Sequence, residues 1–309
     1  MRITDYTAGV RLSGERVVVL GLFDGVHRAH RHLLSVAREE AARRGAELCV
    51  FTFVSEAKAL KPEAERIYAT ETKLALLASA GVEHTVLARF EDLADMDADR
   101  FVREVLCLAL GCTHAVCGYN FRFSRGACAD AAELTARMAA EGRTVSVCEP
   151  VRVRGEVLSA TAIRAWLREG ELALANEALG APYRLSCRAE HGLGLGRRLG
   201  TPTVNLPLPE GLCHPAHGVY RTVAEVDGRR YHAVTNVGVC PTFGRRPAHA
   251  ECYLLDFDGD VYGKTVTVYF LAYLRKERTF SSKEELKMQI ELDKNTTLAE
   301  NPPLDAVLF

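Results

Sequence analysis

The chain has 309 residues, of which 48% are hydrophobic and 26% charged, and its 39 basic and 40 acidic side chains leave a formal net charge of −1. This composition is typical of a globular protein with about two domains, and it excludes extensive disorder. The balanced charge argues against binding nucleic acid through its phosphates. The longest apolar run, 17–23, is far shorter than the ~20 residues of a membrane span. No signal peptide is visible and the ten cysteines form no C-x-x-C pair, so we expect a cytoplasmic protein with no nucleic-acid or membrane partner.

The first 182 residues alternate short apolar runs with alanine-rich helical stretches. Strands separated by helices of about 10–15 residues predict βαβ units on a parallel sheet. We therefore expect an α/β domain over residues 1–182. The expected strands are 17–20, 48–53, 85–88, 114–117 and 144–148, and the expected helices are 31–44, 70–80, 98–110 and 130–141.

From residue 183 onward, strand-like segments separated by glycine and proline replace the helical stretches. Short strands with frequent turn residues predict a small antiparallel β-barrel over residues 183–309. A single C-terminal helix is expected at 283–293, after Ser281 and Ser282. The expected strands are 218–226, 231–236, 252–256 and 265–273.

A candidate anion site follows the first expected strand. Asp24 and Gly25 predict a tight turn, and His27 and His30 then enter a helix on one face. Beyond the carboxyl end of a parallel strand, a helix N-terminus offers unpaired N–H groups to an anion. Two imidazoles there can donate hydrogen bonds to phosphates. The alternative is a pair of histidines on a solvent-facing helical turn.

A second candidate site combines a glycine-rich loop with a short polar strand, in the sequence HGLGLGRRLGTPTVN at 191–205. Glycines let backbone N–H groups approach an anion closely, although a flexible hairpin loop is an equal alternative. Thr203 and Asn205 point the same way in an extended chain and offer two neutral oxygens to a hard cation such as Mg²⁺. The segment GDVYGKT at 259–265 is not a phosphate-binding P-loop, because three residues separate its glycines and a strand follows it.

These motifs occur in an order that resembles the prokaryotic bifunctional riboflavin kinase/FAD synthetase family. The resemblance rests on GLFDGVHRAHRHLL, FTF, GYNFRF, LSATAIR, the glycine loop with Pro-Thr-x-Asn, and TNVGVCPTFG followed by AECYLLDF. It covers nearly the whole chain. It implies a Rossmann-like nucleotidyltransferase domain followed by a riboflavin-kinase-type barrel. The implied substrates are riboflavin, FMN and ATP, with FAD as a product and Mg²⁺ as cofactor.

The resemblance also implies roles for individual residues in the two reactions. In adenylyl transfer to FMN, His27 and His30 would steady the phosphates of ATP. In riboflavin phosphorylation, Glu251 would be the catalytic base, while Thr203 and Asn205 would hold the metal. The implied nucleotide- and phosphate-binding residues are Asp24, Gly25, Asn120, Thr161, Arg164, Gly192, Gly194, Gly196 and Arg197. Arg275 and Glu277 match an R-x-E element on the flavin side, with an ion pair that only shapes the barrel as an equal alternative.

The chain departs from the family pattern in its first module. Ala29 replaces the glycine between the two histidines, and Ala160 replaces a serine in the late S-S-T-x-I-R motif. Ser124 replaces the glycine after FRF, and Val54-Ser55-Glu56-Ala57 stands where the family has Pro-His-Pro. In the second module, Cys240 replaces an arginine. One alternative is therefore a monofunctional riboflavin kinase with a degenerate first module. Another is a non-catalytic flavin- or nucleotide-binding protein.

Overall fold

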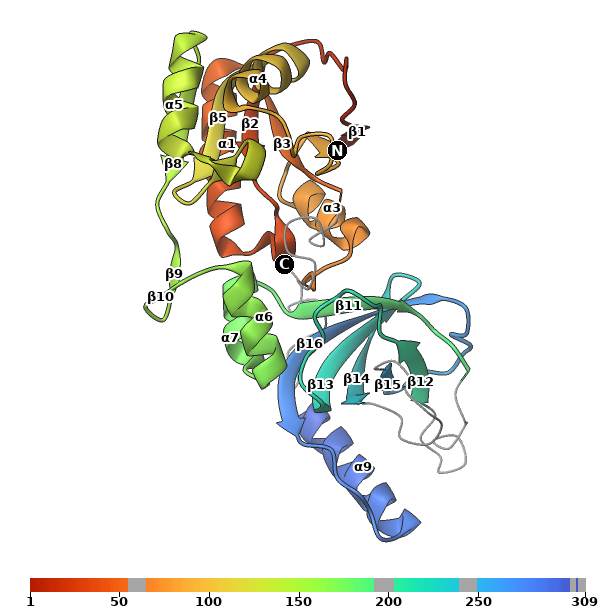
Figure 1. The fold of residues 1–309 in the computed structure, drawn as a ribbon. Coiled ribbons are helices and arrows are strands. Elements are labelled where there is room, and N and C mark those ends of the chain that lie inside the picture. The colour runs from red at the N-terminus through yellow and green to blue at the C-terminus, as the bar shows by residue number, and fades with distance from the viewer. Residues whose placement is uncertain (55–64, 192–202, 239–248, 301–303, 305–309) are drawn as a thin grey trace. The chain divides into compact units, whose positions relative to one another are not determined.

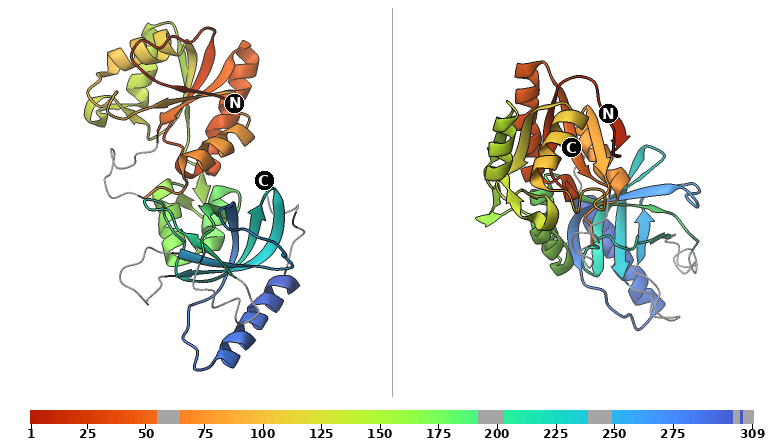
Figure 2. Two further views of the ribbon diagram at one scale, coloured as in Figure 1. Left: turned by 90° about the vertical axis from the view of Figure 1, so that its right-hand side faces the viewer. Right: turned by 45° about the horizontal axis from the view of Figure 1, so that its top comes forward.

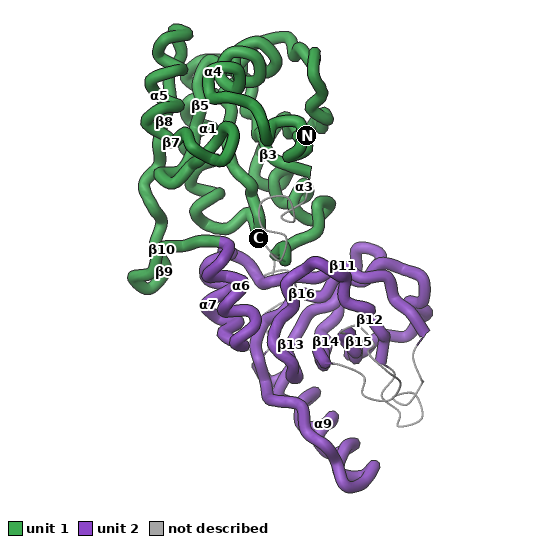
Figure 3. The backbone as a smooth tube through the Cα atoms, in the orientation of Figure 1, with its two compact units in different colours: residues 1–159 green, residues 160–309 purple. Residues whose placement is uncertain are grey.

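The computed structural model describes residues 1–54, 65–191, 203–238, 249–300 and 304. The chain divides into two compact units, residues 1–159 and 160–309 (Figure 3). Helices α6 (Ala160–Glu169) and α7 (Leu172–Leu179), which the sequence analysis assigned to the first domain, therefore pack with the second unit. Asn176 on α7 makes the connection, because its amide donates to the Phe270 carbonyl and its Oδ1 accepts from the Tyr183 N–H.

The first unit is a six-stranded, wholly parallel sheet in the order β1-β4-β3-β2-β5-β8, with helices packed against it (Figure 1). The α/β class and every expected strand are confirmed, and the sequence analysis missed one edge strand, β1. The strands are β1 Arg2–Asp5, β2 Arg16–Leu20, β3 Glu47–Phe53, β4 His84–Ala88, β5 Cys112–Gly118 and β8 Thr144–Cys148. Short pairs are formed by β6 Arg122–Phe123 with β7 Ala129–Asp130, and by β9 Arg152–Val153 with β10 Glu156–Val157.

The helices of this unit are α1 Arg28–Arg44, α3 Thr70–Ser79, α4 Ala98–Arg100 and α5 Ala131–Ala140. Local signals fix their ends: Gly45 closes α1 in the left-handed region, and Asp130 with Glu133 forms a capping box on α5. The α-helix expected at 98–110 is a single turn, α4, that continues as a π-helix over Phe101–Ala109. The wider helix turns Phe101, Val105 and Leu106 into the core.

The second unit is a curled antiparallel sheet in the order β11-β16-β13-β14-β15-β12 (Figure 2). A bridge between Glu190 and Asn205 brings the two outer strands together, which confirms the expected barrel. The strands are β11 Tyr183–Arg188, β12 Thr203–Pro207, β13 Gly218–Val226, β14 Arg229–Gly238, β15 His249–Leu254 and β16 Thr265–Arg275. The glycine-lysine segment at 259–265 forms a turn that leads into β16, not into a helix, as expected.

The C-terminal helix α9 spans Lys283–Ala299 and is longer than predicted. The Ser282 hydroxyl caps it by accepting from the Glu285 N–H at 3.1 Å. Within the described ranges, no helix is both long and apolar enough to span a bilayer.

Candidate active sites

The first candidate site lies where β2 ends at the carboxyl edge of the parallel sheet. The chain turns sharply there, with positive φ at Phe23 (54°), Gly25 (83°) and Val26 (42°). The Asp24 carboxylate stabilises this turn by accepting from the Ile67 N–H at 2.8 Å. Left-handed backbone at a β-branched residue is strained, and such strain is concentrated at ligand sites. The tight turn expected at Asp24 and Gly25 is therefore present.

His27 and His30 are brought together by this turn. Their rings stack with centroids 3.7 Å apart, and the Phe23 ring covers His30 at 4.8 Å. The His27 side chain is only 5% exposed, which argues against the solvent-facing alternative. Burial lowers the pKa of His27 to about 4, and burial with the nearby His27 and Lys73 lowers that of His30. Both Nδ1 atoms are buried and lack a hydrogen-bond partner in the part of the chain that the structure describes.

Lys73 is a residue of this site that the sequence analysis missed. It lies on α3, is only 7% exposed, and its ammonium donates to the Phe53 carbonyl at the end of β3 at 2.8 Å. Burial lowers the pKa of Lys73 to about 8, opposed by the Asp24 carboxylate. A lysine is seldom buried unless it is paired. The site therefore holds a cation beside two neutral imidazoles.

Asn120 follows β5, the strand next to β2. The chain continues from β2 to β3 on one side, while β5 lies on the other, so β2 and β5 flank a topological switch point of the kind that binds ligands in open α/β sheets. Asn120 is exposed at that edge. A Cβ at position 118 would lie 3.4 Å from the Asn120 Oδ1, so Gly118 leaves room for the Asn120 side chain. His27, His30 and Asn120 thus share one edge of the sheet.

Thr161 and Arg164 lie in the first turns of α6, which belongs to the second unit. The Arg164 guanidinium donates to Thr161 Oγ1 at 3.2 Å. Their expected role beside the nucleotide stays a prediction. Ser124, which replaces a family glycine, has a φ of 68°, a conformation that glycine adopts without strain.

The second candidate site is a row of polar side chains across three strands of the barrel. Asn205 on β12 pairs directly with Glu251 on β15, and Glu251 pairs directly with Asn236 on β14. Paired residues in antiparallel strands have Cβ atoms about 4.5–5.5 Å apart on the same face. Their neighbours Val204 and Cys252 are buried in the barrel, so the row lies on its outer face. Thr203 shares this face with Asn205, as the spacing predicted.

Asn236 and Glu277 extend this row. The Asn236 amide donates to Glu277 Oε1 at 3.0 Å, and the absence of a side chain at Gly238 makes room, because a Cβ there would lie 2.8 Å from the Glu277 Cδ. Asn236 belongs to the sequence motif TNVG, from which no role for its side chain could be predicted. His249 Nε2 lies 3.6 Å from the other carboxylate of the face, Glu251. The structure thus brings together Thr203, Asn205, Glu251 and Glu277.

Arg275, at the end of β16, is engaged elsewhere. Its Nε donates to both carboxylate oxygens of Asp293 at 3.1 Å, and its Nη2 donates to Oδ2 at 2.7 Å. This bidentate pair ties β16 to α9. The geometry supports the alternative that Arg275 shapes the barrel, and contact with flavin stays a prediction.

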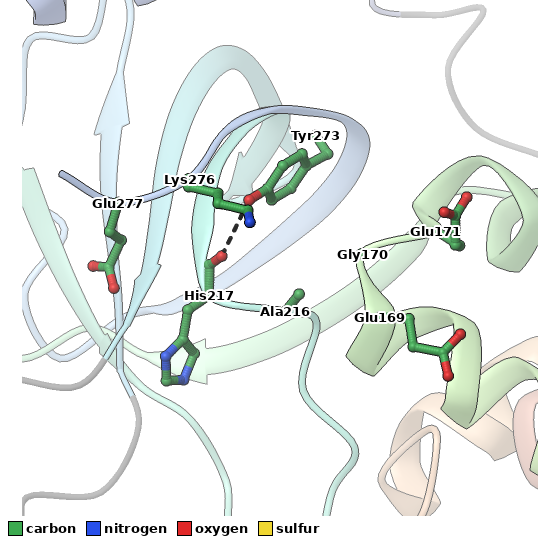
Figure 4. Close-up of a pocket in the computed structure, with 8 residues that line it drawn as sticks. All are labelled: Glu169, Gly170, Glu171, Ala216, His217, Tyr273, Lys276 and Glu277. Atoms are coloured by element: carbon green, nitrogen blue, oxygen red, sulfur yellow. Dashed lines mark hydrogen bonds between the residues drawn. The ribbon is translucent and has the colours of Figure 1, made fainter.

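A cavity of about 480 Å³ opens next to Glu277 (Figure 4). Tyr273 and Lys276 come from β16 and the segment after it, and His217 precedes β13. The Tyr273 hydroxyl donates to the His217 carbonyl at 3.4 Å. The volume lies within the ~300–1,000 Å³ of typical small-molecule pockets. The remaining lining residues are Glu169, Gly170, Glu171 and Ala216.

Several sequence predictions lie outside the described residues. They are the phosphate-loop residues Gly192, Gly194, Gly196 and Arg197, and the departures at 55–57 and 240. Among the residues that are described, no cluster of three or more His, Cys, Asp or Glu side chains could bind a metal. The Thr203 hydroxyl and the oxygen of the Asn205 side-chain amide nevertheless fit Mg²⁺, which takes few protein oxygens and completes its shell with water and substrate phosphate.

Comparison with known families matches both halves of the chain. The FAD synthetase family model matches residues 11–162, and the riboflavin kinase family model matches residues 179–300.

Curated relatives match over nearly the full length. The chain is 36% identical to a bifunctional riboflavin kinase/FMN adenylyltransferase of Pseudomonas fluorescens, with 90% of each chain covered. Proteins of the same description from Escherichia coli K12 and Bacillus subtilis are 34% and 31% identical, with 91% of each chain covered. A crystal structure described as a macrolide-efflux protein from Streptococcus pneumoniae has a TM-score of 0.90 at 29% identity, covering 97% of this chain and 100% of that one.

Proposed function

Because the chain belongs to the bifunctional riboflavin kinase/FMN adenylyltransferase family, we propose that its barrel phosphorylates riboflavin and that its first unit adenylylates FMN, both with ATP. The observation that carries the kinase assignment is the row in which Asn205 and Glu251 are direct cross-strand partners, with Thr203 on the same face. Metal-type oxygens and a carboxylate from distant parts of the sequence share one surface.

In the kinase reaction, the primary alcohol of riboflavin attacks the γ-phosphorus of ATP. An O–P bond forms, the bond to ADP breaks, and Glu251 takes the alcohol proton. Glu251 is suited to this role because its side chain is 45% exposed and therefore open to a substrate. Thr203 and Asn205 would hold Mg²⁺, which neutralises charge on the transferring phosphates. Glu277 borders the cavity beside this row, and we assign that cavity to the flavin ring.

In the adenylyltransferase reaction, a phosphate oxygen of FMN attacks the α-phosphorus of ATP, and pyrophosphate leaves. His27 and His30 donate hydrogen bonds to phosphate oxygens, which stabilises the charge that develops in the transition state. The anionic ligand favours the protonated imidazoles, so their low pKa in the free protein rises on binding. Asn120 contacts the nucleotide or flavin from the neighbouring strand.

The decisive test of the kinase base is Glu251→Gln. Purified protein with riboflavin, ATP and Mg²⁺ should yield FMN on chromatography, and the substitution should slow this step about 10²–10⁴-fold. Glu210→Gln is the matched control, because Glu210 is an exposed carboxylate after β12. Near-normal FMN formation by Glu251→Gln would show that another group takes the proton.

The same assay, run with riboflavin and separately with FMN, separates the rival functions. Appearance of FAD supports the bifunctional enzyme. FMN formation without FAD indicates a kinase whose first module has degenerated at positions such as Ala29 and Ala160. Flavin binding without ATP consumption would indicate a non-catalytic protein. The cytoplasmic location stays a prediction from the sequence.

A further inference from the structure

Asn236 is a polar residue of the outer barrel face that has no role in the reaction proposed above. It is the direct cross-strand partner of Glu251 on β14, on the side opposite Asn205. The polar row therefore has two ends. Asn205 and Thr203 mark the end for metal and phosphate, while Asn236 and Glu277 mark the end that borders the cavity.

The orientation of the Asn236 carboxamide is fixed by its neighbour. An ionised carboxylate only accepts hydrogen bonds, so the group that faces Glu277 at 3.0 Å must be the Asn236 NH₂. The other end of the carboxamide, Oδ1, is therefore an acceptor. Oδ1 is buried, and no described residue donates a hydrogen bond to it. Buried acceptors are nearly always paired, so a missing partner points to a ligand.

The position of Oδ1 limits what that ligand group can be. It must donate a hydrogen bond, and it must lie next to the group that Glu251 deprotonates, because the two side chains are direct cross-strand neighbours. It also lies away from the phosphate end of the row. In riboflavin, the secondary hydroxyl on the carbon next to the primary alcohol meets all three conditions.

We propose that Asn236 Oδ1 accepts a hydrogen bond from this secondary hydroxyl, which makes Asn236 a specificity-determining residue for a polyol substrate. This inference rests on the proposed role of Glu251 in the kinase reaction. Glu277 acts as a positioning residue that holds the carboxamide with its oxygen toward the substrate. Gly238 permits this arrangement by leaving space for the Glu277 carboxylate.

A cycle that removes each partner in turn tests the proposal. Wild type and Asn236→Ala are compared on riboflavin and on 4′-deoxyriboflavin, which lacks the secondary hydroxyl. A hydrogen bond to a substrate hydroxyl gives strong discrimination, and we expect wild type to prefer riboflavin at least ~10-fold in kcat/KM. Asn236→Ala should reduce this preference to about twofold or less, because the variant has no buried acceptor that 4′-deoxyriboflavin would leave unpaired. Asn295→Ala, on the exposed face of α9, should keep the wild-type preference.

Equal losses of Asn236→Ala on both substrates would overturn the proposal and make Asn236 a structural residue. FAD formation from FMN in the same chain checks that the protein is intact. If Asn236→Ala does not fold, the double variant Asn236→Asp/Glu277→Gln is used, since it reverses donor and acceptor and keeps an oxygen toward the substrate. It should retain the preference for riboflavin, whereas the single Asn236→Asp variant, with two carboxylates in contact, should lose it; any other result refutes the assignment.

Failure of the inference is distinguishable from failure of the proposed function. A wild-type protein that forms no FMN refutes the kinase assignment itself. A wild-type protein that forms FMN, shows the expected loss in Glu251→Gln, but does not discriminate between the two substrates refutes only the role of Asn236.

Discussion

Arg275→Met should undock the C-terminal helix from the barrel. The substitution removes the partner of Asp293, whose side chain is 7% exposed and receives three hydrogen bonds from the Arg275 guanidinium. Gln289 also donates to Asp293 at 2.8 Å, but it carries no charge. An isolated buried carboxylate costs several kcal/mol, and breaking a fully buried pair costs about 3–5 kcal/mol.

The expected size of the effect follows from the exposure of both partners. Arg275 is 22% exposed, which places the pair between the fully buried case and exposed pairs, which contribute about 0.2–1 kcal/mol. We therefore expect Arg275→Met to lower the free energy of unfolding of the second unit by about 2–3 kcal/mol. Arg278→Met is the matched control, since Arg278 is 47% exposed and its ion pair with Glu285 spans 3.7 Å, and it should cost less than ~0.5 kcal/mol.

The protein carries its own probe for this measurement. Its single tryptophan, Trp166, is buried in α6 of the second unit, so its fluorescence during urea unfolding reports on that unit. In a double-mutant cycle, Arg275→Met with Asp293→Leu should recover much of the loss, because no unpaired charge remains. A loss no larger than that of Arg278→Met would refute the reasoning and show that water compensates Asp293.

Three further predictions concern single groups. Lys73→Met should impair FAD formation from FMN at least ~10-fold and leave FMN formation unchanged, because it removes the cation at the adenylyltransferase edge; equal effects on both products would contradict this. Burial lowers the pKa of His27 to about 4, so below pH 6.5 the unfolded chain binds more protons than the folded chain. The stability that neutral His27 contributes above pH 6.5 should therefore fall by about 3 kcal/mol as the pH drops to 4. In urea titrations, His27→Gln should remove this contribution and leave the part of the pH dependence that comes from His30. Gly238→Ala should displace Glu277 and raise KM for riboflavin, with KM for FMN in FAD synthesis as the unaffected control.

The sequence predicted the architecture well because its patterns are local. Buried runs such as 48–53 and alanine-rich helices with clear caps need no tertiary information, and both sheets followed from them. The exception was 98–110, whose sequence fits an α-helix, while the structure widens it to a π-helix to bury Phe101 and Val105. Edge strand β1 was missed because Ile3 is its one apolar residue and its pairing with β4 is the main evidence for a strand.

The candidate sites were only partly predictable, since their composition depends on pairing across the chain. His27 and His30 were found because they follow one strand within one motif. In the sequence, Lys73 cannot be distinguished from an ordinary exposed lysine of a helix. Only the packing of α3 in the structure shows that its ammonium is buried and donates to the Phe53 carbonyl. Asn236 likewise could be identified only from the register of β14 and β15, which places it directly opposite Glu251.

That register is itself held by the inner face of the barrel. Cys252 and Thr235 are fully buried partners on β15 and β14, and the Thr235 hydroxyl pairs with that of Thr222 at 2.8 Å. A slip of one residue would move every side chain of β15 to the opposite face, burying the Glu251 carboxylate and exposing Cys252. Burying an unpaired carboxylate is far more costly than repacking a thiol. The core pairs therefore fix the positions of Asn205, Glu251 and Asn236, although none of these three lies in the core.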